Sequence, residues 1–347
     1  MHAYIMDADI KQLSELPGKL RRDAPAPSVD ADGTEVLVDV YSASLNLFDQ
    51  LQVRGKYQIK KPFPYIPGTE IAGVISANSP IPDGCNWVPG KTRVFGSANG
   101  SYAEQVVAES SSLQEIPEGM SFEEASGLYV TWPTSYAALR FRANVQPGEW
   151  VLIHAGAGGV GLCAIQIAKA LGAKVIATAG SDEKLKVCTE VGGADHAVNY
   201  RDKEWFKKVK EITEDHGVDV VYDPVGMILP SLKCIAWNGR ILVIGFAAGD
   251  IEKVPANLVL LKQCTLMGVF WGLNTVKDPE QVPKVWDGIM ELLTSKKAKA
   301  VVYKKVYDGL DQLTPALEAL MARETWGKVV LRVRADPQNP PKGKSNL

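Results

Sequence analysis

The sequence predicts an α/β protein of two domains, one β-rich and barrel-like and one built on a doubly wound, six-stranded parallel sheet. The first observation is length, because 347 residues exceed one typical core. The second is a change of pattern near residue 126, where short strands give way to alternating helices and apolar strands. The third is the order of elements after residue 272. We expect one domain at 1–125 and 272–347 and the other at 126–271.

Short strands are expected in the first domain along residues 36–40, 71–75 and 102–107. Turn-forming pairs such as Pro67-Gly68 and Asn99-Gly100 separate them, which is typical of a β-rich barrel. Six apolar strands follow in the second domain, at 151–154, 174–178, 197–199, 218–222, 240–244 and 265–269. Helices at 281–294 and 313–322 and a strand at 328–333 cannot extend that completed sheet in chain order, so the chain should return to the first domain.

The first strand of the second domain leads into a glycine-rich turn, the most informative segment of the chain. Gly156, Gly158 and Gly161 form the pattern Gly-x-Gly-x-x-Gly, and a helix-like stretch follows. Such a turn collects bare backbone N–H groups at a helix N-terminus, which suits a pyrophosphate. We expect the first glycine to make the tight turn, the second to admit the phosphates and the third to allow close packing. With a strand before and after it, the motif predicts a dinucleotide site.

The end of the next strand indicates which dinucleotide binds. Where NAD-specific proteins usually carry a carboxylate for the ribose 2′-hydroxyl, this chain has small residues ending at Ser181. A 2′-phosphate would fit there, and Lys184 is close enough in sequence to pair with it. Asp182 and Glu183 would oppose a phosphate, but we assign them to the start of a helix. The pattern favours NADPH over NADH.

In the first domain, two interpretations of Asn46 and Asp49 are open. The pair has the spacing of a helix start, with Asn as N-cap, and it also has the polarity of a functional site. Tyr57 either lies in a solvated loop or directs its hydroxyl at a nicotinamide. With four histidines and five scattered cysteines, a zinc site is not expected, and no Gly-x-Ser-x-Gly motif predicts a hydrolase.

Composition narrows the class of protein further. The net charge of −2 and the pI near 6.2 indicate no excess of positive charge of the kind that binds nucleic acid. No signal peptide is expected at the start, and the longest uncharged run, at 151–168, fits a strand–turn–helix better than a membrane span. Reduced thiols in the cytoplasm are the expectation. The terminal Ser345-Asn346-Leu347 is interpreted as a frayed end, with a peroxisomal address as the alternative.

The chain resembles the zinc-independent, zeta-crystallin-like quinone oxidoreductases of the medium-chain dehydrogenase/reductase superfamily. The resemblance spans about residues 36–333. It rests on Leu45-Asn46-x-x-Asp49, Arg54-Gly55-x-Tyr57, Pro67-Gly68-Thr69-Glu70-x-Ala72-Gly73-Val74, the glycine turn, Asn199-Tyr200-Arg201, Val221-Tyr222-Asp223-Pro224-Val225-Gly226, Gly245-Phe246-Ala247-x-Gly249 and Arg323-Glu324-Thr325-x-Gly327-Lys328-Val329-Val330-Leu331. It implies a GroES-like first domain and a Rossmann second domain. Zinc-dependent relatives carry a Cys ligand at the position of Asn46 and a His ligand at that of Thr69, so the resemblance implies no metal.

The resemblance also implies roles for individual residues. Asn46, Asp49 and Tyr57 would line the substrate cleft. From the chemistry of the reduction, we take the Asn46 amide and the Tyr57 hydroxyl as candidate hydrogen-bond donors to the substrate oxygen. The cofactor contacts would be Gly158, Gly159, Val160 and Gly161 at the pyrophosphate, Lys184 and Tyr200 at the 2′-phosphate, Thr134 at the nicotinamide, and Arg323 from the returning segment. To these we add Gly156 from the glycine motif and Ser181 from the end of the second strand as cofactor-binding residues.

Three functions are weighed on this basis. The first is NADPH-dependent reduction of quinones by hydride or electron transfer, because a substrate reduced without a metal must already be activated. The second is reduction of an alkenal or enone double bond, and the third is an NADPH-binding protein with a structural or regulatory role. A small-molecule substrate and no nucleic acid or membrane partner are expected. The apolar strand at 266–270 suggests a homodimer.

Overall fold

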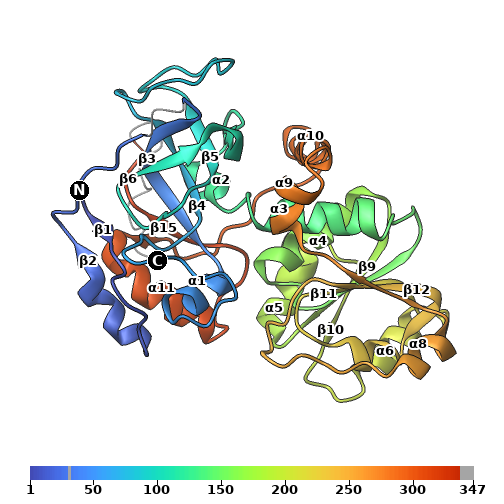
Figure 1. The fold of residues 1–347 in the computed structure, drawn as a ribbon. Helices are drawn as coiled ribbons and strands as arrows, with labels where there is room; N and C mark the ends of the chain where they lie inside the picture. Colours follow the sequence, from blue (N-terminus) through green and yellow to red (C-terminus); the bar gives the residue numbers. More distant parts are fainter. Residues whose placement is uncertain (30–32, 337–347) are drawn as a thin grey trace, which may run out of the picture. The chain divides into compact units, whose positions relative to one another are not determined.

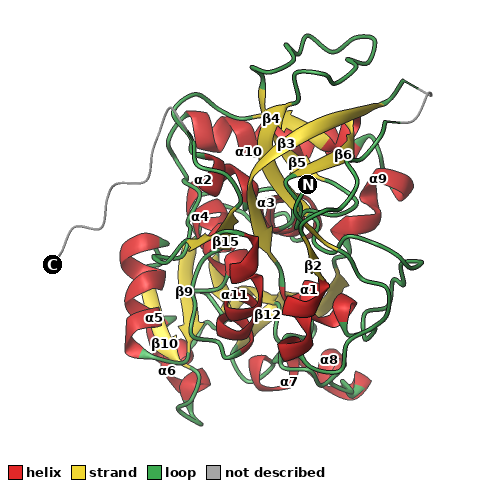
Figure 2. Ribbon diagram, turned by 90° about the vertical axis from the view of Figure 1, so that its left-hand side faces the viewer, coloured by secondary structure: helices red, strands yellow, loops and turns green. Residues whose placement is uncertain are grey.

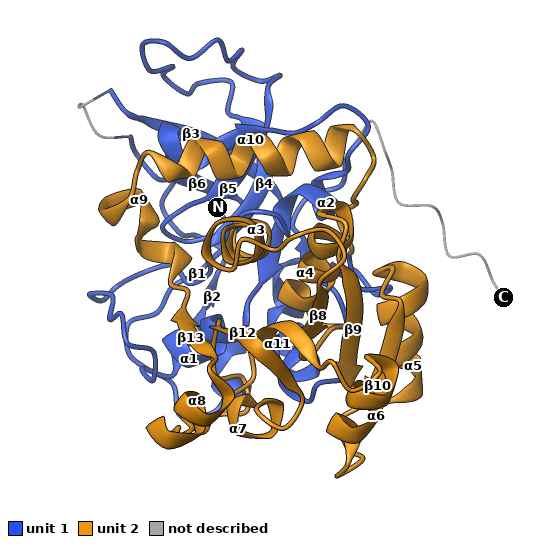
Figure 3. Cartoon of the chain, turned by 90° about the vertical axis from the view of Figure 1, so that its right-hand side faces the viewer, with its two compact units in different colours: residues 1–129, 302–347 blue, residues 130–301 orange. Residues whose placement is uncertain are grey.

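The computed structural model describes residues 1–29 and 33–336. These residues form two compact units (Figure 3): unit 1 comprises residues 1–129 and the part of the chain from 302, and unit 2 comprises residues 130–301. Figure 1 gives the labels of the helices and strands used below. The terminal tripeptide considered as a peroxisomal address lies outside the described residues.

Unit 1 is built around a mainly antiparallel sheet with the strand order β14-β15-β3-β4-β5-β7, and β6 pairs with β3 off this path. Its helices α1 (Leu47–Val53) and α11 (Leu313–Met321) lie side by side (Figure 2), and α2 (Phe122–Ser126) packs on β3 and β4. The strands are β1 (Ala3–Tyr4), β2 (Leu20–Arg21), β3 (Glu35–Leu45), β4 (Glu70–Ile75), β5 (Arg93–Ser97), β6 (Gln105–Glu109), β7 (Leu113–Glu115), β14 (Tyr307–Asp308) and β15 (Val329–Arg332).

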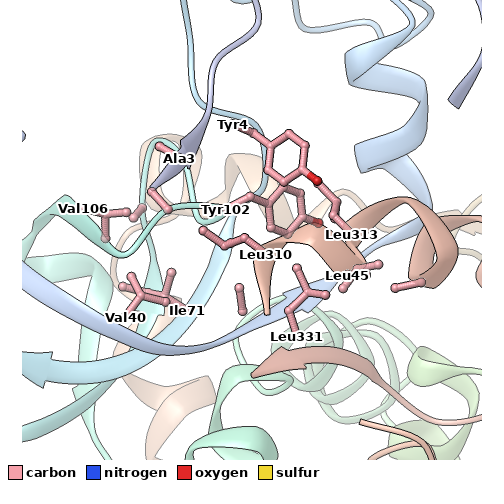
Figure 4. Close-up of a cluster of buried hydrophobic side chains, with 14 of the residues drawn as sticks. Ala3, Tyr4, Val40, Leu45, Ile71, Tyr102, Val106, Leu310, Leu313 and Leu331 are labelled. Atoms are coloured by element: carbon pink, nitrogen blue, oxygen red, sulfur yellow. The ribbon is translucent and has the colours of Figure 1, made fainter. Parts of the chain in front are cut away.

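The long strand β3 organises this sheet. On one side it pairs with β4, and on the other it pairs first with β6 and then with β15. The last strand in the sequence therefore completes a sheet begun by the first long one, as the colours of Figure 1 show. Buried apolar side chains from both ends of the chain, among them Tyr4, Leu45, Leu313 and Leu331, share one core (Figure 4). This burial is the main stabilising contribution to the unit.

Unit 2 contains the six-stranded parallel sheet that the sequence analysis predicted, and its strand order is β10-β9-β8-β11-β12-β13. This is the strand order of a Rossmann fold, and the strand order reverses between β8 and β11. The strands are β8 (Trp150–Ile153), β9 (Lys174–Ala179), β10 (His196–Asn199), β11 (Val218–Asp223), β12 (Ile235–Val243) and β13 (Thr265–Gly268).

Helices cover both faces of this sheet. One face packs in a core with α6 (Trp205–Ile212), α7 (Ile228–Ser231) and α8 (Ala256–Lys262). Helix α4 (Gly159–Ala170) packs on β8 and β9 and also contacts α3 (Thr131–Tyr136). Helix α5 (Asp182–Lys186) packs on β9 and β10. The predicted fold class, a GroES-like domain joined to a doubly wound parallel sheet, is confirmed.

The chain returns to unit 1 at residue 302, later than the expected residue 272. The segment 272–301 stays in unit 2 because α10 (Gln281–Thr294) packs on α3. Gly288 of α10 lies so close to the Tyr136 ring that a Cβ there would overlap the tyrosine hydroxyl. Helix α9 (Asn274–Lys277) precedes this contact. The bounds of α10 agree with the expected helix, but its partner was not visible in the periodicity.

Two further observations concern the chain as a whole. No helix within the described ranges is both long and apolar enough to cross a membrane. All five cysteines are free thiols, and four of them are buried.

Candidate active site

The glycine motif follows β8, and its last glycine, Gly161, lies in the first turn of α4. A left-handed residue does make the turn after β8, but it is Ala155, with φ of +48°, and not Gly156. A Cβ at Gly156 would instead press on Ala177 of β9 and Cys188, and a Cβ at Gly161 would overlap the carbonyl oxygen of Ala155. Both glycines are therefore needed for close packing, which corrects the turn-forming role expected of the first.

Gly158 differs from the other two glycines. It is the N-cap of α4, and the nearest protein atom to a Cβ built on it is the Ala155 oxygen, at 3.2 Å. The first backbone bond of α4 runs from Leu162 N–H to Gly158 O. The N–H groups of Gly159, Val160 and Gly161 precede it and project at the N-terminus of a twelve-residue helix, the arrangement that binds an anion.

The end of β9 carries the residues expected to bind the 2′-phosphate. Ser181 is the N-cap of α5, and its Oγ accepts a hydrogen bond from Lys184 N–H at 3.4 Å. Tyr200 follows the neighbouring strand β10 and lies against Gly180, where a Cβ would press on the tyrosine hydroxyl. Ser181 and Tyr200 thus both lie next to Gly180, and the backbone of Lys184 is joined to Ser181, while Asp182 and Glu183 are exposed in the first turn of α5.

A buried histidine anchors the strand that leads into the turn. His154 is fully buried, with Nδ1 3.0 Å from Thr178 Oγ1 and Nε2 2.7 Å from Ser231 Oγ. Because Ser231 donates its own proton to Met227 O, the imidazole is the donor in the second contact, so the neutral ring carries its proton on Nε2. Burial lowers the pKa of His154 to about 4.

Thr134 lies in α3, which is tethered to the glycine turn. Its hydroxyl donates to Val130 O at 2.7 Å. The adjacent Ser135 Oγ lies 3.1 Å from Val160 O and 2.9 Å from the Tyr222 hydroxyl. Thr134 therefore belongs to the same part of unit 2 as the glycine turn, and its contact with a nicotinamide stays a prediction.

In unit 1, Asn46 and Asp49 form the helix start that one interpretation of the sequence predicted, and a role in a functional site stays a prediction. Asn46 is the N-cap of α1, and its backbone N–H donates to Asp49 Oδ2 at 2.7 Å, as in a helix start. The Asn46 side chain serves a different purpose. Its Nδ2 donates to Glu70 Oε2 at 2.7 Å, and its Oδ1 accepts from Lys328 Nζ at 2.8 Å.

The topology of the sheet explains this meeting. Asn46 directly follows β3, Glu70 opens β4 and Lys328 directly precedes β15, and both of these strands pair with the end of β3. Lys328 Nζ also donates to Glu70 Oε2 at 2.7 Å. Sequence analysis assigned no role to Glu70 or Lys328. Their only signal was that each stands in a motif shared with the family.

Asp49 is fully buried behind this group. Its Oδ2 accepts a second hydrogen bond from the Tyr102 hydroxyl at 2.8 Å, whereas Oδ1 has no hydrogen-bond partner among the described residues. Burial raises the pKa of the Asp49 carboxyl to about 6, against the opposing effect of the hydrogen bonds from Asn46 N–H and Tyr102 and of the nearby Lys328 charge. A carboxyl in this setting changes charge close to neutral pH.

Tyr57 and Arg323 complete the predicted set. The half-buried Tyr57 ring stacks on Phe48 of α1 with centroids 5.5 Å apart, and burial together with the Asp49 charge raises the pKa of its hydroxyl. Arg323 is exposed just beyond α11 in a left-handed conformation. In the described ranges, no cluster of three or more His, Cys, Asp or Glu residues has the arrangement of a metal site.

Comparison with known families places both units. Residues 32–118 match the model of the alcohol dehydrogenase GroES-like domain, and residues 159–291 match that of the zinc-binding dehydrogenase family. A quinone oxidoreductase-like protein 2 homolog of Nematostella vectensis is 37% identical over 307 residues, which cover 87% of this chain and 82% of the relative.

Solved structures agree with this placement. Quinone oxidoreductase of Escherichia coli, crystallised in complex with NADPH, superposes with a TM-score of 0.82 at 27% identity, covering 96% of this chain and 100% of that one. CurK enoyl reductase superposes with a TM-score of 0.82 at 26% identity, covering 96% and 99%. The predicted resemblance is confirmed, and the chain belongs to the quinone oxidoreductase family within the medium-chain dehydrogenase/reductase superfamily.

Proposed function

We propose that this protein is an NADPH-dependent reductase of quinones that works without a metal ion. The observation that carries the proposal is the Asn46 amide, a buried neutral donor held in place by Glu70 and Lys328. By the family resemblance, it stands where zinc-dependent relatives carry a metal ligand. A neutral donor polarises a carbonyl less than a metal does, so the substrate must already be electron-poor, as a quinone is.

The residues of unit 2 fit NADPH. The N–H groups of Gly159, Val160 and Gly161 would hold the pyrophosphate, and Gly158 leaves the backbone open for its approach. Ser181, Lys184 and Tyr200 would hold the 2′-phosphate, Thr134 would contact the nicotinamide, and Arg323 of unit 1 would add a further contact. When bound, NADPH supplies the hydride.

The residues of unit 1 act on the substrate. Asn46 would donate its amide N–H, and Tyr57 its hydroxyl, to the substrate oxygen on which negative charge develops. Donors of this kind contribute roughly tenfold to a thousandfold to a rate. Asp49 holds the backbone of Asn46 in place through its Oδ2. No covalent intermediate with a side chain is required.

A second candidate function is reduction of an alkenal or enone double bond. The likeness to an enoyl reductase favours it, and the same donors would polarise the conjugated carbonyl. The two functions differ in their products: reduction of a quinone, by hydride or electron transfer, yields a hydroquinone with both oxygens protonated, whereas reduction of an enone places the hydride on the β-carbon and a proton on the α-carbon.

We further propose a homodimer in the cytoplasm, formed through β13. Among the strands in the described part of the chain, β13 pairs only with β12, so its outer edge carries no other described strand. Large apolar side chains are exposed nearby in sequence, with Leu260 77%, Leu261 67% and Phe270 53% exposed. Sedimentation velocity of the wild type and of a Leu260→Glu variant tests this: we expect a dimer and a monomer, respectively, and a monomeric wild type would contradict the proposal.

The initial rate of NADPH oxidation tests the function directly. We would compare an ortho-quinone with a simple enone, with a chelator present throughout. Faster turnover of the quinone is expected. A preference for the enone would favour double-bond reduction, and tight NADPH binding without turnover of either substrate would favour a binding protein with a structural or regulatory role.

A further inference from the structure

Lys328 is a buried cation whose hydrogen-bonding capacity is fully used. The residue is 6% exposed, and its Nζ donates to Leu45 O at 3.3 Å, Asn46 Oδ1 at 2.8 Å and Glu70 Oε2 at 2.7 Å. An ammonium group has three N–H bonds, and each therefore has an acceptor here. A side chain held by three bonds has little freedom to move.

The neighbours of Asn46 determine which way its amide faces. Lysine can only donate, and an ionised glutamate can only accept. Lys328 therefore requires oxygen on its side of the amide, and Glu70 requires nitrogen on the other. A flipped amide would lose both hydrogen bonds and would set its N–H₂ against the ammonium and its oxygen against the carboxylate.

One N–H bond of the Asn46 side-chain amide is not used by these two neighbours. One of its two N–H bonds goes to Glu70, and the second makes no hydrogen bond to the residues that the structure describes. We propose that Lys328 and Glu70 are positioning residues for the reduction, because together they lock the Asn46 amide so that this second N–H is the donor offered to the substrate oxygen. This inference rests on the proposed function and deepens it.

Stability alone is a poor explanation for the pair. Lys328 and Glu70 lie 2.7 Å apart with side chains 7% and 0% exposed, so both charges have lost most of their hydration. Replacing a buried ion pair with neutral groups of similar size is often neutral or stabilising, because the cost of removing two charges from water offsets their attraction. The hydrogen bonds to Asn46 provide a role that a neutral pair would not perform, since neutral partners do not dictate the orientation of an amide.

A double-mutant cycle tests the inference. The first arm is Asn46→Ala, and the second is the combined change Lys328→Met with Glu70→Gln, which removes both charges and leaves no unpaired one. We would measure kcat and KM for the quinone at saturating NADPH. Each arm should lower kcat by roughly tenfold to a hundredfold. The two arms together should lower it no further than the larger single effect, because Lys328 and Glu70 act only through Asn46.

Several outcomes would overturn the inference. If the losses of kcat in the two arms multiply when combined, Lys328 and Glu70 act independently of Asn46. If either arm keeps the wild-type kcat, the residues changed in that arm have no role in the reduction. A wild type that reduces neither quinone nor enone would instead contradict the proposed function, so the two failures are distinguishable. Lys91→Met, a change at an exposed lysine of unit 1, is the matched control and should leave kcat unchanged.

A further variant covers the case in which the neutralised pair does not fold. Lys328→Arg keeps a group that can only donate at this position. Its kcat should lie within about threefold of the wild type if the amide orientation is what matters. A folded Lys328→Arg protein, with an unchanged melting temperature, that loses as much kcat as Asn46→Ala would contradict the inference.

Discussion

The candidate sites of the two units differ in the charge of the buried groups that form them. In unit 2 the glycine turn offers bare backbone N–H groups, and the buried side chains behind it, His154, Thr178 and Ser231, are neutral. In unit 1 the side chains around Asn46 are charged although they are buried, with Glu70 fully inaccessible and Lys328 nearly so. The difference agrees with the two tasks proposed for them. A phosphate brings its own charge and needs only dipoles, whereas a neutral carbonyl needs a donor aimed at it.

The largest expected effect tests the bare backbone of unit 2. Gly161→Ala places a Cβ against the carbonyl of Ala155, where neither backbone segment can yield, so the free energy of unfolding should fall by on the order of 4 kcal/mol. Gly158→Ala places its Cβ 3.2 Å from the same oxygen, a tight contact but a much milder one, so it should cost clearly less stability than Gly161→Ala while weakening dinucleotide binding. Denaturant unfolding and a binding titration measure both. Equal loss of stability in the two variants would contradict these separate roles.

The buried neutral His154 of unit 2 should make the free energy of unfolding fall in acid. Below pH 6.5 the unfolded chain protonates His154, whereas the folded chain resists protonation down to about pH 4. Stability contributed by the neutral ring should therefore fall by about 3 kcal/mol as the pH drops from 6.5 to 4. The measurement is the difference in unfolding free energy between the wild type and His154→Gln across this range. A difference that does not vary with pH would show that the ring is already protonated or accessible.

The buried Asp49 of unit 1 should make the free energy of unfolding change with pH in the opposite direction. The folded chain holds a proton on Asp49 up to about pH 6, whereas the unfolded chain releases it near pH 3.8. The contribution of the protonated Asp49 to the free energy of unfolding, about 3 kcal/mol, is therefore fully present below pH 3.8 and is lost as the pH rises through 6. Relative to Asp49→Asn, the wild type should become less stable between pH 4 and pH 7. If both histidine and aspartate variants gave slopes of the same sign, the contrast between the units would fail.

The smallest expected effect concerns the one cation predicted to assist the backbone in unit 2. Lys184→Glu should weaken NADPH binding about thirtyfold, which corresponds to about 2 kcal/mol for a lost charge-assisted hydrogen bond, and should weaken NADH binding far less. Lys186→Glu, an exposed change on the same helix, is the control. Dissociation constants for both dinucleotides provide the test. Equal weakening of both would remove Lys184 as the residue that recognises the 2′-phosphate.

Local patterns were enough to predict most of the fold. The six strands of unit 2 are apolar runs separated by helical periodicity, and burial on both faces leaves a strong signal. Each strand lies close to its expected position, except that β12 begins at Ile235 and not at residue 240. The expected helix at 281–294 also has the observed bounds. Its assignment to unit 1 was wrong, since the contact between Gly288 and Tyr136 that holds it in unit 2 joins residues far apart in the sequence.

The candidate site was only half visible for the same reason. Gly158, Lys184 and Asn46 stand in recognisable motifs, so their types and spacing suggested their roles. The turn-forming residue was misassigned to Gly156, because a left-handed alanine leaves no mark in a sequence. Glu70 and Lys328 are 258 positions apart and were assigned no role.

The sequence by itself therefore determined the family, the two kinds of domain and the dinucleotide motif, because each depends on residues that are neighbours along the chain. Only the tertiary structure decided that Glu70 and Lys328 enclose the Asn46 amide from both sides. That arrangement exists because β4 and β15 pair with opposite edges of β3, bringing a carboxylate and an ammonium to the end of one strand. Strand pairing between distant segments follows from the packing of the whole sheet, and no local pattern encodes it.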